Sequence, residues 1–87
     1  MQAEILAALS PAAKFNLALK LENVTLPLRH ESENVGTIVD ATGRGFVVVD
    51  MHRELPDAQV TEIAELIVLA VNAQGGFPAS VEMRGAA

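Results

Sequence analysis

The sequence predicts an α+β fold, in which a small antiparallel β-meander packs on one long C-terminal helix. In residues 35–50, two apolar runs flank a short turn that contains Gly43, and this pattern is typical of a β-hairpin. Residues 57–74 carry apolar side chains at helical spacing and are followed by two glycines, which commonly end helices. A chain of 87 residues has room for one domain, so we expect residues 1–87 to form a single domain.

The two ends of the chain are the parts that the sequence determines least. Residues 1–9 are rich in Ala and could form a short helix, and Ser10-Pro11 could either end it or cap and begin another one. Over residues 14–22 apolar and polar side chains alternate, which favours a strand with one buried face. The Ala, Lys and Leu residues there favour a helix by intrinsic propensity. We predict a strand for residues 14–22, with the helix as the alternative, and either a last edge strand or a tail for residues 80–83.

The hairpin of residues 35–50 is predicted to be the centre of the sheet. In its turn, Asp40 can accept hydrogen bonds from the backbone and Gly43 can take a positive φ, and the loop length predicts a bulge with glycine. Residues 46–49 are apolar on both faces, so we expect this strand to be central or covered on both sides. Residues 26–29 could add a short strand with their proline at an edge or bulge, because proline has no N–H to donate.

The predicted helix of residues 57–74 should begin at Pro56-Asp57, with the Asp carboxylate near the positive end of the helix dipole, and stop at Gly75-Gly76. One apolar stripe has the spacing of a buried face: Val60, Ile63, Ala64, Ile67 and Val71. Leu66 and Leu69 lie away from that stripe, so a second helix or a second subunit must cover them. We therefore predict a homodimer whose interface includes Leu66 and Leu69.

Composition excludes several classes of function. The chain has no Cys, which rules out disulfides and thiolate chemistry, and with three Phe and no Trp or Tyr its core must be aliphatic. Its six Lys and Arg residues are scattered and its net charge is −5, so we expect no nucleic-acid binding, which requires a concentrated basic face. No apolar run approaches the roughly 20 residues that span a bilayer. The first residues lack the basic start of a signal peptide, so we expect a cytoplasmic protein with no membrane partner.

Asp50, His52 and Glu54 form the set of residues best suited to chemistry. They alternate at the end of a predicted strand, which places them on one face, and each can bind a metal or transfer a proton. Polar residues are also expected in any strand-to-helix connection, so we predict no catalytic, cofactor or metal site. The alternative is a small-ligand or metal-binding enzyme that uses these three residues. His30 beside Glu31 is a second acid–imidazole pair, for which a solvated loop is the simpler interpretation.

Three segments of the chain resemble one group of proteins. Residues 38–44, 47–50 and 63–72 read IVDATGR, VVVD and IAELIVLAVN. They resemble small uncharacterised proteins of bacteriophages, prophages and mobile elements, which have a V-x-D-A-x-G-R hairpin followed by an apolar helix ending in a phrase like A-x-L-I-V-x-A-x-N. The resemblance covers roughly residues 35–72, lacks that group's Pro-Gly-Pro-Trp opening and includes no catalytic residue. It implies a mobile-element origin and no known activity.

Together these observations predict a small, non-enzymatic protein-interaction module that is homodimeric and encoded by a phage or mobile element. One form of such a protein is an inhibitor of a host protein, such as a host defence protein. The acidic net charge is compatible with a basic partner, although mild acidity also keeps small proteins soluble.

Overall fold

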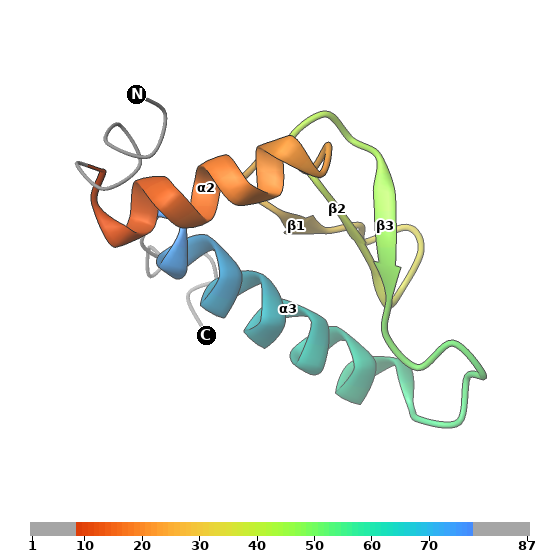
Figure 1. Cartoon of the computed structure of the whole chain (residues 1–87). Helices are drawn as coiled ribbons and strands as arrows, with labels where there is room; N and C mark the ends of the chain where they lie inside the picture. Colours follow the sequence, from red (N-terminus) through yellow and green to blue (C-terminus); the bar gives the residue numbers. More distant parts are fainter. Residues whose placement is uncertain (1–8, 78–87) are drawn as a thin grey trace.

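The computed structural model describes residues 9–77, which form a three-stranded antiparallel sheet and two helices (Figure 1). The elements are α2 (Pro11–Leu21), β1 (Arg29–His30), β2 (Thr37–Val39), β3 (Gly45–Val48) and α3 (Asp57–Gln74). The strands lie in the order β1-β2-β3, and each pairs antiparallel with its neighbour. The predicted α+β fold, with a meander around the hairpin and one long helix after it, is confirmed. The segments 1–8 and 78–87, which include most of the predicted N-terminal helix and the whole of the predicted 80–83 strand, lie outside the described residues.

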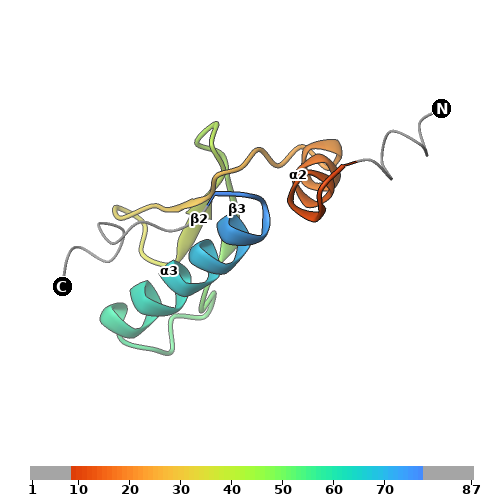
Figure 2. The same ribbon diagram turned by 90° about the vertical axis from the view of Figure 1, so that its left-hand side faces the viewer.

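The sheet and the two helices enclose an aliphatic core. α3 runs along one side of the sheet, and its C-terminal end lies next to α2 (Figures 1 and 2). The buried members of the core are Val24, Leu26, Leu28, Ile38, Ala64 and Val68. Every second residue of the extended segment between α2 and β1 belongs to this set. A strand was predicted for residues 26–29. The observed strand, β1, begins only at Arg29, after the proline, and is shorter than predicted.

The strand predicted for residues 14–22 is wrong, because this segment belongs to helix α2. Ser10 caps the helix by accepting a hydrogen bond at its Oγ from Ala13 N at 3.1 Å, and a proline follows it at the first helical position. Phe15 and Leu19, four residues apart, pack against the core. No residue of α2 is buried within the described structure, so helical propensity and the cap outweigh the alternation of side chains.

The prediction that residues 46–49 form a central or doubly covered strand is also wrong. β3 is at the edge of the sheet, next to β2 alone among the described strands. Val47 packs against the core, whereas Phe46 and Val48 are 40% and 53% exposed. The predicted bulge is confirmed, because the register shifts between the pairs Ile38–Val47 and Val39–Gly45. The apolar run thus covers the core with one face and leaves the other face open.

Helix α3 has the predicted bounds, and two residues of the predicted stripe, Val60 and Ala64, are buried. The side chains that it buries are Val60, Ala64, Val68 and Asn72. Ile67, which was predicted to be buried, is 37% exposed, and Ile63 and Val71 lie at the margins. A four-residue spacing therefore describes the contact with the sheet better than the mixed spacing read from hydrophobicity alone.

The end of α3 is the predicted glycine cap. Gly75 is the C-cap residue, and Gly76, with a φ of 92°, is the residue in the left-handed conformation. Gly76 N donates to Ala73 O at 3.1 Å, and Phe77 N donates to Asn72 O at 2.7 Å. This pair of hydrogen bonds is the Schellman motif, which satisfies carbonyl groups that the helix itself leaves without partners.

Within residues 9–77, no helix is both long enough and apolar enough to cross a membrane.

Candidate functional site

The connection between β3 and α3 holds the three residues that the sequence singles out for chemistry. Asp50 has a φ of 58°, and its two carboxylate oxygens accept hydrogen bonds from Glu54 N and Leu55 N, each at 2.9 Å. The N–H of Glu54 and then that of Leu55 hold the pKa of Asp50 below its ordinary value of 3.8, because they stabilise the ionised form. The carboxylate of Asp50 is therefore engaged by the backbone of its own loop.

The other two residues of the set, His52 and Glu54, are exposed in the same loop. In the part of the chain that the structure describes, no group of three His, Cys, Asp or Glu residues is arranged to hold a metal ion. The alternation in the sequence does not place the three on one face, because the backbone leaves the extended conformation at Asp50 and turns again at Arg53, whose φ is 57°.

An open hollow lies over this connection. Its volume is about 340 Å³, and the charged residues that line it are Glu33, Asp50, Arg53 and Asp57. Sites for small ligands usually enclose most of the ligand and place a few polar groups among apolar walls. This hollow is open and mixed in charge, and one of its three carboxylates, that of Asp50, already accepts two backbone hydrogen bonds. It therefore gives little support to the enzyme alternative.

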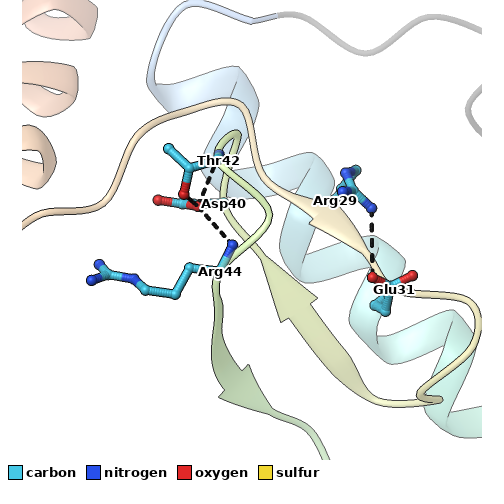
Figure 3. Close-up of polar contacts among 5 residues, drawn as sticks. All are labelled: Arg29, Glu31, Asp40, Thr42 and Arg44. Atoms are coloured by element: carbon cyan, nitrogen blue, oxygen red, sulfur yellow. Dashed lines mark hydrogen bonds and ion pairs between the residues drawn. The ribbon is translucent and has the colours of Figure 1, made fainter.

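His30 and Glu31 also serve the fold. His30 Nε2 accepts a hydrogen bond from Gly36 N at 2.9 Å, which closes the loop between β1 and β2. Glu31 instead faces Arg29, with 3.9 Å between Oε2 and Nη1 (Figure 3). The two neighbours in sequence thus have different partners and do not form an acid–imidazole pair.

Asp40 is the most completely hydrogen-bonded acid of the described residues. It is buried in the hairpin turn, where one carboxylate oxygen accepts from Thr42 Oγ1 at 2.6 Å and from Thr42 N at 3.0 Å (Figure 3). The same oxygen lies 3.3 Å from Arg44 N, and the other oxygen accepts from Thr25 N at 3.0 Å. These donors, led by the Thr42 hydroxyl and the Thr25 N–H, lower the pKa of Asp40 from 3.8 to about 2.

A buried amide that sequence reasoning missed joins α3 to the segment before β1. Asn72 Oδ1 accepts from Leu28 N at 2.7 Å, and Asn72 Nδ2 donates to Leu28 O at 2.9 Å. The side chain thus pairs with Leu28 as a neighbouring strand would. Its signal in the sequence was its spacing, because it lies four residues after Val68 and eight after Ala64 on the buried face.

Four of the eight large apolar side chains that are exposed in the described residues lie on two surfaces. The helix surface consists of Leu66 and Ile67, which are 44% and 37% exposed on α3, with the half-buried Leu69 beside them. The edge surface consists of Phe46 and Val48 on β3. Of the two predicted interface residues, Leu66 is open to a partner and Leu69 only partly so, and Ile67 is the accessible neighbour that the sequence assigned to the core.

The chain matches no protein-family model, no curated protein and no solved structure.

Proposed function

We propose that this protein is a small, non-enzymatic protein-interaction module that acts as a homodimer. The observation that carries the proposal is the grouping of exposed large apolar side chains on the helix surface and the edge surface. Single exposed apolar residues are ordinary, but grouped ones are typical of interaction sites. Burial of each such side chain against a partner contributes roughly 1.5–3 kcal/mol.

The polar groups support binding over catalysis. Asp40, Asp50 and His30 each accept hydrogen bonds from backbone N–H groups, so these acceptor atoms stabilise turns and loops. General acid–base catalysis needs a titratable group held by an orienting partner within reach of a substrate. These three side chains hold their own loops in a fixed conformation. Fixed loops are useful to a protein that binds a partner through its surface.

The helix surface suits a second protein. It is apolar, and Glu65 lies on the same helix beside it, which favours a partner that offers an apolar patch with a basic residue at its rim. The resemblance to proteins of phages and mobile elements suggests a host protein, such as a defence protein, which this chain would inhibit by occupying a surface. We propose that it acts in the cytoplasm, as the sequence predicts.

The first test is the oligomeric state of the full chain. Sedimentation velocity at micromolar concentration should give the mass of a dimer. A strictly monomeric protein would refute the homodimer.

The second test concerns the helix surface. A photo-crosslinking residue at position 66 should capture a host protein in cells, and the purified partner should then bind the wild type in calorimetry. Leu66→Glu should abolish that binding without changing the melting curve. Gln59→Glu, which adds the same charge at an exposed position of α3, should bind normally. Equal binding by Leu66→Glu and wild type would disprove this use of the helix surface.

A third measurement separates binding from the enzyme alternative. A ligand that binds only the native state must raise its stability. We expect neither zinc nor manganese to raise the melting temperature of the wild type. A rise that disappears in the double variant His52→Ala/Glu54→Ala would instead favour a metal-dependent function.

A further inference from the structure

Helix α2 differs from the other described elements in how it packs. No residue of α2 is buried within the described structure, and Phe15 and Leu19, which pack against the core, are half-buried. The buried hydrophobic side chains all come later in the chain, between residues 24 and 68. In Figure 2, α2 lies to one side of the sheet and α3. Among the described residues, the elements after α2 therefore contain the buried core.

Two buried polar contacts join the elements that follow α2. Asp40 accepts from Thr25 N at 3.0 Å, which ties the hairpin turn to the segment before β1. Asn72 accepts from Leu28 N at 2.7 Å, which ties α3 to the same segment. Residues 24–77, which we call the body, are thus held together by contacts in which α2 takes no part.

The connection between α2 and the body is short and exposed. Glu22 is the C-cap residue of α2, Asn23 follows it with a φ of 67°, and Val24 already belongs to the core. Glu22 and Asn23 are both exposed, and the Asn23 carbonyl accepts a hydrogen bond from the Arg44 guanidinium. Hinges are commonly a few residues at the end of an element that absorb a change in φ and ψ, and Glu22-Asn23 occupies such a position.

The place on which α2 rests is the glycine turn after α3. A Cβ on Gly75 would lie 3.5 Å from Phe15 Cδ2 and would clash with the side chain of Leu26. A Cβ on Gly76 would lie 3.4 Å from Ala12 Cβ. We call Leu26, Gly75 and Gly76 the seat of α2. The close approach of α2 to this seat shows what would be uncovered if the helix moved away.

We infer that α2 is a hinged cover, which opens as one unit about Glu22-Asn23 while the body stays folded, and which uncovers the seat when it opens. A helix of 11 residues is marginal in water on its own, so α2 loses its internal hydrogen bonds once it leaves the seat. Elements with few buried contacts are those that open locally at a lower free energy than the whole fold. This opening requires neither the homodimer nor a host protein.

Hydrogen-exchange NMR of the full chain at a series of low urea concentrations tests this inference. The hydrogen-bonded amides of α2 should share one opening free energy, which should change little with urea because the opening exposes little surface. Their protection should be on the order of a hundredfold lower than that of the Val68 amide, whose exchange requires unfolding of the body. The Leu28 amide, which donates to Asn72, should be protected as Val68 is.

Two truncations distinguish a cover from a helix that unfolds together with the body. Val60 is buried near the start of α3, away from α2 (Figure 2). Its contacts persist when the cover is open, so Val60→Ala should speed the exchange of the Val68 amide about tenfold and leave the amides of α2 unchanged. Phe15→Ala removes a contact that only the closed state makes, so it should speed exchange in α2 and in the body alike.

The outcome of Val60→Ala decides the inference. Equal acceleration of the α2 amides and of Val68 would show that the whole described fold opens together, and would overturn the cover. So would protection that declines gradually from one end of α2, which is fraying, or a Leu28 amide that exchanges as α2 does. If Phe15→Ala fails to fold, the wild-type urea series still decides, because the inference requires different urea dependences for α2 and for Val68.

Discussion

Two polar side chains, Asp40 and Asn72, replace backbone partners at places where the elements of this fold meet. Asp40 joins the hairpin turn to Thr25, in the segment after α2, and Asn72 joins α3 to Leu28 before β1. Buried polar groups are favourable only when their hydrogen bonds are made, and no buried side-chain nitrogen or oxygen of the described residues lacks a partner. Both residues therefore hold two elements together. Replacing either of them should lower the stability of the whole fold.

The first prediction concerns the pH dependence that Asp40 gives to stability. Its pKa is about 2 in the folded protein and 3.8 is its ordinary value, so the native state binds the proton less readily than the unfolded chain. The stabilisation is therefore fully present above 3.8 and is lost as the pH falls towards 2. Thermal melts of the wild type should show a steep loss of stability across this interval.

The variant that tests this assignment is Asp40→Asn. It should be less stable than the wild type at neutral pH, because its NH₂ group cannot accept the hydrogen bonds that the carboxylate accepts, and its melting temperature should change less with pH below 3.8. Glu33→Gln, at an exposed loop position, should follow the wild-type profile. Identical acid profiles for Asp40→Asn and wild type would show that another carboxylate is responsible.

The second prediction concerns Asn72→Leu. Leucine has a similar size but leaves the N–H and C=O of Leu28 without partners in the core. Each buried backbone group that loses its partner costs about 1–3 kcal/mol, so urea unfolding should show a loss of at least that size. Gln74→Leu, at an exposed position at the end of the same helix, should change stability little. Equal unfolding midpoints for the two variants would mean that water replaces the amide.

At the scale of an element, the hairpin depends on two glycines with different surroundings. Gly36 and Gly43 have φ values of 93° and 91°, which are unfavourable for other residues. A Cβ on Gly43 would lie 3.9 Å from the nearest atom outside its turn, in Arg29, whereas a Cβ on Gly36 would lie 2.6 Å from Val49 O. Both positions carry conformational strain on substitution, but only Gly36 adds a clash with backbone.

The third prediction follows from this difference. Gly43→Ala should cost about 1–2 kcal/mol, the ordinary penalty for a left-handed residue. Gly36→Ala should cost clearly more, because the strand β3 must move away from the added carbon. Unfolding in urea measures both, and the matched pair separates strain from crowding. If Gly36→Ala is no worse than Gly43→Ala, the backbone at Val49 yields easily and the ladder beside it is weak.

The elements show which features of this fold are readable from sequence. The turn residues Asp40 and Gly43 and the glycines after α3 were predicted correctly, because each has a local conformational reason. The segment 14–22 was not, because its alternation was a stronger pattern than the Ser10 cap, and no deep burial enforced a strand. Hydrophobicity also placed residues 46–49 at the centre of the sheet, since it cannot distinguish apolar residues that face the core from those that face an open edge.

The candidate interaction surfaces could also be predicted only in part from the sequence. The sequence identified Leu66 as exposed, because it lies off the apolar stripe of α3. It did not identify Ile67, which is apolar and close to the stripe, nor the amide of Asn72, since polar residues are not expected in a core. The edge surface depends on the strand order, which arises from tertiary pairing and has no local signature.

At the scale of the whole molecule, the core that residues 9–77 form consists of few fully buried side chains. Hydrophobic residues make up 51% of the sequence, yet no side chain of α2 is fully buried in the described structure, and Leu21 at its end is 70% exposed. Domains of this size bury a smaller fraction of their surface than larger ones, so their stability margin is thin. Association through apolar surfaces is one way to add buried area.

The last prediction is that the stability of the protein depends on its concentration. If the native state is a dimer, mass action raises the melting temperature with concentration, and a hundredfold increase should raise it by several degrees in a domain of this size. Calorimetry across that range measures the effect. A wild-type melting temperature that stays constant over the whole range would show that the monomer is the stable unit, and that α2 and α3 expose their apolar side chains for a different protein alone.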